Sequence, residues 1–127
     1  RLDEQRQQGE VRAAVRIAAP PARVYAAMTD CRAALAFVPG LHRCAVIEAG
    51  AAGRWEIIEH EVDLGWWAPR VRYSFRAEYV PDRSVEFAHV AGDLRQNEGR
   101  WDLEPLDGGR HTLVTYRVRL VPAAPVP

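Results

Sequence analysis

Two histidines occupy positions where an imidazole could act as an acid, a base or a hydrogen-bonding group. In the segment 54–64 the apolar residues and His60 alternate with acidic residues, and His89 follows Val85 and Phe87 at the same spacing. Because successive side chains of a strand point to opposite faces, both histidines are predicted to face the interior. There they either serve an apolar binding cavity or are core histidines satisfied by a neighbour. For each histidine taken alone we favour the core interpretation.

Other catalytic chemistry has little support in the residue types. The chain has no lysine, which excludes Schiff-base chemistry. Its only serines, Ser74 and Ser84, lack a Gly-x-Ser-x-Gly context. His42 and Cys44 share one face of a predicted strand, but no third residue is in place to orient them. We therefore expect binding rather than catalysis, and the two inward histidines are the candidates if a reaction occurs.

A metal site or another cofactor is not expected. The pair His60-Glu61 lacks the further ligands that a metal ion needs. Glu59, Glu61 and Asp63 lie on the face opposite the apolar row. They are therefore predicted to solvate an outer face rather than to work as an acid–base pair.

Composition limits the class of protein and its partners. The 127 residues are predicted to form a flexible leader, 1–10, and a single domain, 11–127. Seventeen basic and seventeen acidic residues give no net charge, which argues against nucleic acid as a partner. No apolar run is long enough for a transmembrane segment. We expect a cytoplasmic protein; since the sequence begins at Arg1, a removed signal peptide is the alternative.

The two cysteines, Cys31 and Cys44, show no metal or redox spacing. We predict buried free thiols, with a disulfide as the less favoured alternative. The pair Trp66-Trp67 interrupts the alternation after the segment 54–64. One indole is predicted to be partly exposed and to meet a ligand or partner, and packing of both is the alternative.

The order of the predicted elements indicates an α+β fold. A first strand at 11–17 ends at Pro20-Pro21, and short helices are predicted at 21–28 and 31–37, the second capped by Thr29 or Asp30. Six further strands, near 41–48, 54–64, 71–79, 85–89, 100–104 and 114–120, are separated by turn residues such as Asp107-Gly108-Gly109. Their inward rows carry Tyr73, Phe75, Phe87, Trp101 and Tyr116. About seven antiparallel strands with the helices set apart define the α+β class.

Several stretches resemble one known family. They are Ile17-Ala18-Ala19-Pro20-Pro21, Val24-Tyr25, Thr29-Asp30, Phe37-Val38-Pro39-Gly40-Leu41, and Gly92-Asp93-Leu94 followed by Gly99-Arg100-Trp101. The chain resembles the polyketide cyclase/dehydrase and coenzyme Q-binding START-like proteins, within the SRPBCC superfamily of the birch pollen allergen and the steroidogenic lipid-transfer domains. The resemblance implies a helix-grip fold, in which a curled antiparallel sheet surrounds a long C-terminal helix. Residues 121–127 contain three prolines, so we expect that this helix is missing from the chain.

The resemblance also implies a function. We expect the domain to bind or transport a hydrophobic small molecule, such as a quinone, a lipid or an aromatic polyketide, in a cavity between sheet and helices. A polyketide aromatase/cyclase or dehydratase and a protein-interaction module, including a homodimer that covers an open groove, are the alternatives. The predicted ligand-binding residues are Val38, Leu41, His60, Trp67, Tyr73, Phe75, Phe87, His89, Trp101 and Tyr116.

Overall fold

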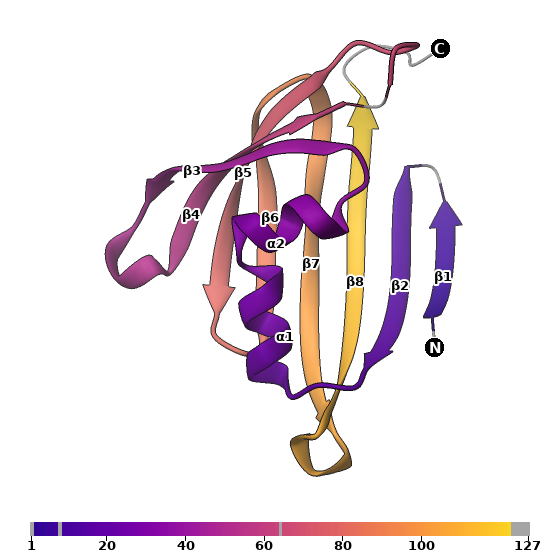
Figure 1. Cartoon of the computed structure of the whole chain (residues 1–127), viewed down its shortest axis with the longest axis vertical. Coiled ribbons are helices and arrows are strands. Elements are labelled where there is room, and N and C mark those ends of the chain that lie inside the picture. The colour runs from indigo at the N-terminus through magenta and orange to yellow at the C-terminus, as the bar shows by residue number, and fades with distance from the viewer. Residues whose placement is uncertain (1, 8, 64, 123–127) are drawn as a thin grey trace.

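The computed structural model describes residues 2–7, 9–63 and 65–122 and shows one antiparallel sheet with two helices in front of it (Figure 1). The strands are β1 (Leu2–Gln7), β2 (Glu10–Ile17), β3 (Leu41–Ala49), β4 (Trp55–Val62), β5 (Val71–Val80), β6 (Ser84–Gly92), β7 (Leu94–Leu106) and β8 (His111–Pro122). The helices are α1 (Pro21–Met28) and α2 (Cys31–Phe37), and single 3-10 turns span Ala51–Gly53 and Asp107–Gly109. The strand order β1-β2-β8-β7-β6-β5-β4-β3 and the two helices confirm the α+β class.

Both helices begin and end where the sequence predicts them to. Pro21 occupies the first helical position of α1, where a missing N–H group costs no hydrogen bond. Asp30 caps α2, and its Oδ1 accepts a hydrogen bond of 2.9 Å from the backbone N–H of Arg32. Two helices of eight and seven residues are too short to be stable alone, so they depend on packing against the sheet.

The first residues form a strand, and our prediction of a flexible leader over residues 1–10 is wrong. The backbone of β1 pairs with β2 from Leu2 opposite Val15 to Gln7 opposite Glu10, which raises the number of strands to eight. Without β1, β2 would be the edge strand of the sheet, and its backbone N–H and C=O groups on that side would have no partner strand. Residues 2–7 show no apolar alternation, so the sequence did not indicate this strand. Backbone hydrogen bonds pair the two strands and do not require an alternating pattern of side chains.

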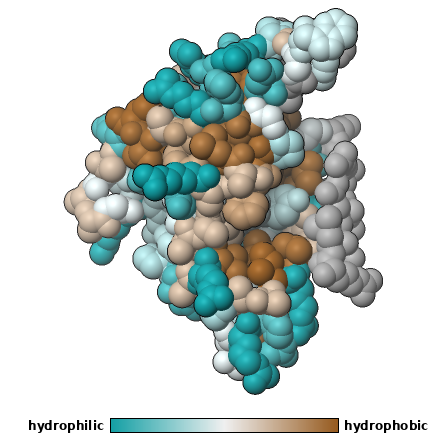
Figure 2. Space-filling view, viewed as in Figure 1, coloured by the Kyte–Doolittle hydropathy of each residue, from teal (hydrophilic) through white to brown (hydrophobic). Residues whose placement is uncertain are grey.

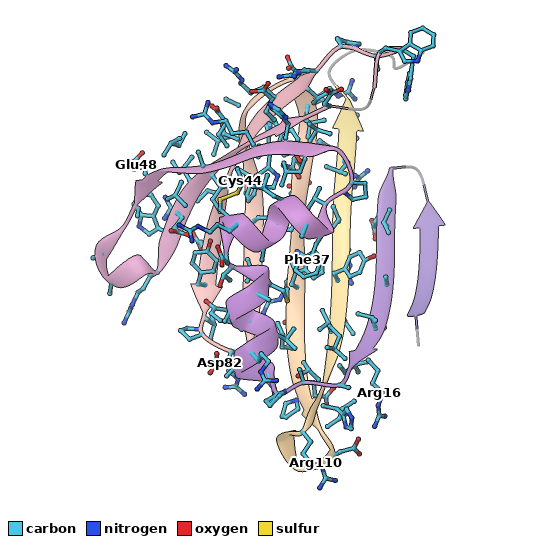
Figure 3. All side chains as sticks on the ribbon, in the orientation of Figure 1. Arg16, Phe37, Cys44, Glu48, Asp82 and Arg110 are labelled. Atoms are coloured by element: carbon cyan, nitrogen blue, oxygen red, sulfur yellow. A yellow bond between two sulfur atoms is a disulfide. The ribbon has the colours of Figure 1, made fainter. Side chains whose placement is uncertain are left out.

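Cys31 and Cys44 form a disulfide between α2 and β3, so the prediction of two free thiols is wrong. Figure 3 shows the bond where α2 lies beside β3. Their Cα atoms are 5.4 Å apart, a separation that suits a disulfide. A spacing of 13 residues along the chain does not reveal this contact, which exists only because α2 folds back onto β3.

Two groups of buried side chains form the core, on the face of the sheet that carries the helices, called here the inner face. Their buried members are Val24, Leu103 and Val114 in the first group, and Ile58, Ala77 and Val85 in the second. Tyr25 of α1 and Trp101 of β7 pack against both groups and so join them. Burial of these side chains holds the helices on the sheet.

The alternation of β4 is confirmed, and it separates the two faces of the sheet. Ile58 is buried on the inner face, whereas Glu61 lies on the outer face and accepts hydrogen bonds from Arg70 and Arg72 at 2.9 and 3.2 Å. The hairpin predicted at 107–109 is also confirmed: Asp107 and Gly108 have φ of 52° and 67°, and the Asp107 carboxylate contacts both Arg16 and His111. Leu64, at the end of the predicted alternation 54–64, and residues 123–127, in the segment 121–127 where we expect the C-terminal helix to be missing, lie outside the described residues.

Candidate functional site

Six side chains from five neighbouring strands form an aromatic surface on the inner face of the sheet. We define the aromatic surface by His60, Tyr73, Phe75, Phe87, Trp101 and Tyr116. The strand register brings them together: His60 is opposite Tyr73, and Trp101 is opposite Tyr116. Directly opposite residues of antiparallel strands share a face, so the register places predicted site residues side by side.

The rings of the aromatic surface lie in two groups. In the first, the ring centroids of His60 and Phe75 are 4.9 Å apart, and those of Phe75 and Phe87 are 5.7 Å apart, both with edge-on geometry. In the second, Trp101 and Tyr116 are stacked with centroids 4.5 Å apart. These separations are typical of favourable aromatic pairs. The sequence predicted the members, and the structure shows which of them touch.

The aromatic surface is accessible. All six of its side chains are half-buried rather than buried. Figure 2, drawn from the helix side, shows hydrophobic residues gathered in patches on this face of the molecule. Phe37 at the end of α2 is also 70% exposed on the helix side (Figure 3). A hydrophobic molecule that settled on this face would remove apolar area from water.

Glycine at position 99 makes room for one of these rings. Gly99 of β7 is opposite Phe87 of β6. A Cβ atom at this position would lie 2.9 Å from the Phe87 ring and 2.2 Å from the backbone oxygen of Arg117. Any larger residue would therefore displace the Phe87 ring or the neighbouring strand.

His60 and Tyr73 form the polar part of the first aromatic group. The His60 Nδ1 atom and the Tyr73 hydroxyl are 3.1 Å apart, within hydrogen-bond distance. Burial lowers the pKa of His60 to about 4 and raises the pKa of the Tyr73 hydroxyl. Both groups are therefore neutral near pH 7, and they form a neutral hydrogen-bonded pair.

His89 presents a polar atom without a protein partner. It lies on the inner face opposite Phe75, and its Nδ1 atom is buried and has no hydrogen-bond partner among the described residues. An unpaired buried polar atom costs about 1–3 kcal/mol of stability. Such an atom is unusual in a folded protein. A ligand would remove the cost by hydrogen-bonding to this nitrogen, which requires the side chains that cover it to move.

A second polar pair was not among the predicted site residues. The Tyr79 hydroxyl donates a hydrogen bond of 2.7 Å to Glu56 Oε1, and the ring of Tyr25 meets the Tyr79 ring edge-on at 6.4 Å. Burial, and then the Glu56 carboxylate, raise the pKa of Tyr79. The signal was present in the sequence, since Glu56 has the same parity in β4 as Ile58 and so belongs to the inner face.

The other predicted site residues, Val38, Leu41 and Trp67, take no part in the ring pairs of the two aromatic groups. Leu41 is buried at the start of β3, opposite Val62, and the carbonyl of half-buried Val38 accepts its backbone N–H at 3.1 Å. Trp67 is 49% exposed in the loop after β4, and its neighbour Trp66 is 98% exposed. The described contacts do not join Trp67 to the aromatic surface.

The described residues hold neither a metal cluster nor a membrane-spanning helix. In residues 2–7, 9–63 and 65–122 no group of three or more His, Cys, Asp or Glu side chains is placed to hold a metal ion. Within the same residues, no helix has the length and apolar character needed to cross a membrane. The polar groups described on the inner face are the His60 and His89 imidazoles, the Tyr73 and Tyr79 hydroxyls and the Glu56 carboxylate.

The curled antiparallel sheet with two short helices defines the class as START-like, and the sequence places the chain within it. A model of the family described as polyketide cyclase / dehydrase and lipid transport matches residues 17–127, and the chain belongs to this family. The match confirms the resemblance recognised from the motifs at 17–41 and 92–101. Comparison with curated proteins gave no match.

Solved structures confirm the fold. A START superfamily protein from Mycobacterium smegmatis aligns with a TM-score of 0.78 and 19% identity over 93% of this chain and 80% of its own. A STAR-related lipid transfer protein from Xanthomonas axonopodis gives 0.78 and 17% over 99% and 78%. An aromatase/cyclase from Streptomyces sp. R1128 gives 0.75 and 18% over 91% and 69%. At these identities the likeness is one of fold.

Proposed function

We propose that the protein binds a hydrophobic small molecule on the aromatic surface of the inner face and carries it without chemical change. The observation that supports this most is the unpaired Nδ1 atom of His89 beside half-buried aromatic rings. An apolar surface with a few polar groups is typical of ligand sites. The match to a family of lipid transport and polyketide-modifying proteins agrees with such a ligand.

The chemistry of the surface favours a flat, weakly polar ligand such as a quinone, an aromatic polyketide or a lipid with a carbonyl head. Flat rings can stack on Phe75 and Phe87, and a ligand polar group can hydrogen-bond to the His89 imidazole. Each 100 Å² of apolar area removed from water contributes roughly 2.5 kcal/mol. Stacking on the rings and a hydrogen bond to His89 would together set the orientation of the ligand.

The first experiment asks whether a ligand accompanies the protein. Native mass spectrometry of the protein as purified from cells should show an added mass that organic extraction removes. Titration with menadione, a small quinone, followed by tryptophan fluorescence then gives an affinity. His89→Ala should weaken menadione binding roughly tenfold, because one hydrogen bond and ring contact are lost.

A matched control is available on the same chain. His42 is an exposed histidine of β3, so His42→Gln should leave menadione affinity unchanged. Phe75→Ala should weaken binding at least as much as the His89 substitution, since it removes the ring between His60 and Phe87. Equal affinities for the wild type and for both inner-face variants would overturn the proposal.

Proton-transfer catalysis is the second candidate function, and the His60–Tyr73 pair is the observation that favours it. A neutral imidazole hydrogen-bonded to a phenol can accept a proton from a substrate carbon or oxygen. However, a pKa of about 4 makes His60 a weak base at pH 7, and efficient general bases have a pKa near the working pH. Ligand binding and transport therefore have better support than proton-transfer catalysis.

Turnover assays separate the two candidates. An enzyme would convert a polyketide-like β-dicarbonyl substrate, and His60→Gln would abolish turnover while menadione affinity is kept. A carrier would show no turnover with the wild type. A third outcome is that a second copy of the chain covers the aromatic surface. Native mass spectrometry would then show the mass of a dimer, and menadione would compete with dimerisation.

A further inference from the structure

The outer face of the sheet carries three arginines side by side. In the strand register Arg12 of β2 is opposite Arg117 of β8, and Arg117 is opposite Arg100 of β7. All three have the parity of the face away from the helices, and their side chains are 50–65% exposed. We call this the arginine row. Like charges directly opposite one another on neighbouring strands are destabilising, so the arrangement needs a compensating charge.

The adjacent row of the same three strands shows the usual arrangement. There Arg119 of β8 lies between Glu10 of β2 and Glu98 of β7. Basic and acidic residues therefore alternate across the strands in that row. The same alternation of charges would place an acidic residue at the centre of the arginine row, between Arg12 and Arg100. Arg117 occupies that position instead. The contrast identifies Arg117 as the unusual charge.

The partners of the three arginines are unequal. Arg100 Nε lies 3.0 and 3.1 Å from the two carboxylate oxygens of Asp102, and its Nη1 lies 2.8 Å from Glu86. The Nε–H group of Arg12 donates a hydrogen bond to Glu10 Oε1. Among the described residues the ion-pair contact of Arg117 is a distance of 3.9 Å to that same, already occupied oxygen. The guanidinium of Arg117 thus has the least charge compensation in the row.

A hollow of about 450 Å³ lies at the arginine row. Its lining includes the three arginines together with Ala14, Thr115 and Asp102. The register explains its shape: Ala14 and Thr115 are opposite each other in the row next to Arg12 and Arg117. Two small side chains beside long arginines leave a depression that the arginines and Asp102 surround.

We propose that this hollow binds a small dianion, such as inorganic phosphate or a phosphate monoester. Asp102 and Glu86 already bond Arg100, and Glu10 bonds Arg12, so Arg117 is the guanidinium of the hollow with the least charge compensation. Arginine holds phosphate oxygens through paired N–H donors, and the Thr115 hydroxyl adds a further donor. The site lies on the opposite face of the sheet from the aromatic surface, so it does not depend on the ligand binding proposed for that surface.

The experiment compares two arginines of one strand. Inorganic phosphate and phenyl phosphate are titrated by isothermal calorimetry into the protein at low ionic strength, with chloride as the reference anion. Arg117→Gln should weaken phosphate binding at least tenfold. Arg119→Gln, two residues away on the same face, should weaken it less than threefold. Equal losses would show diffuse charge attraction and overturn the proposal, as would the absence of phosphate binding to the wild type.

A second substitution tests the geometry in the opposite direction. Asp102→Asn removes the carboxylate that competes with a phosphate for Arg100, so phosphate affinity should increase about threefold. Unchanged or weaker affinity would contradict a site that includes Arg100. Circular dichroism of each variant checks that the sheet is intact.

Vesicles identify the source of the phosphate. A soluble phosphate compound as the natural ligand predicts that phosphatidic acid vesicles fail to compete with phenyl phosphate. A lipid headgroup predicts co-sedimentation with phosphatidic acid vesicles, weakened by Arg117→Gln but not by Arg119→Gln. Either pattern supports the oxyanion site, whereas co-sedimentation that both substitutions weaken equally points to general surface charge and contradicts it.

Discussion

The two faces of the sheet are built by the same strands yet differ in what stabilises them. In β7, Trp101 packs on the inner face against both groups of the core, while its neighbours Arg100 and Asp102 pair with each other in solvent on the outer face. Burial of an indole contributes several kilocalories per mole, but an exposed ion pair contributes about 0–1 kcal/mol. Stability therefore depends on the inner face, and the outer face is free to vary in charge.

The largest effect should come from the residue that joins the core groups. Trp101→Ala removes contacts with both groups and the stacking on Tyr116, and should lower the free energy of unfolding by about 4 kcal/mol. Urea unfolding measures the change. Trp66→Ala is the control: that indole is 98% exposed, so its loss should matter by less than about 0.5 kcal/mol. Similar effects at both positions would contradict the division of roles between the faces.

The disulfide should have the next largest effect. Cys31→Ser with Cys44→Ser removes a link across 13 residues and should cost about 3 kcal/mol, because the unfolded chain gains freedom. Thermal unfolding with and without a reductant gives the same comparison in the unmodified chain. The double variant should show no effect of reductant. If reduction leaves the wild type unchanged, the bond does not hold α2 on β3.

The inner face should also give the protein a dependence on pH. The pKa of His60 is lowered to about 4 from an ordinary value near 6.5, so the unfolded state binds a proton between these values and the folded state does not. Stability should therefore fall as the pH decreases from about 6.5 to about 4, by about 2 kcal/mol when partial exposure is allowed for. His60→Gln should flatten this part of the curve, and His42→Gln should not.

The smallest effect is expected on the outer face. Asp102→Asn breaks the pair with Arg100 but leaves Glu86 in place, so the free energy of unfolding should change by less than about 1 kcal/mol. Added salt should shrink the difference further, since both groups lie in solvent. A loss of unfolding free energy comparable to that of Trp101→Ala would mean that the ion pairs of the outer face contribute strongly to stability.

Most of the local structure could be predicted from the sequence. Pro21 and Asp30 start the two helices through interactions within a few residues, and the alternation of β4 and β5 assigned His60, Tyr73 and Phe75 to one face. The two errors, the leader and the free thiols, have a common origin. The pairing of β1 with β2 and the Cys31–Cys44 bond both join segments through space, and nothing in the neighbouring residues records them.

Within a strand that the sequence predicted, the sequence by itself determined which side chains share a face, because a regular strand repeats every two residues. Only the tertiary structure decided which residues meet. Strand register left the Nδ1 atom of His89 without a hydrogen-bond partner among the described residues on one face, and placed Arg117 between two arginines on the other. The physical reason is that register depends on the packing and hydrogen bonding of the whole sheet.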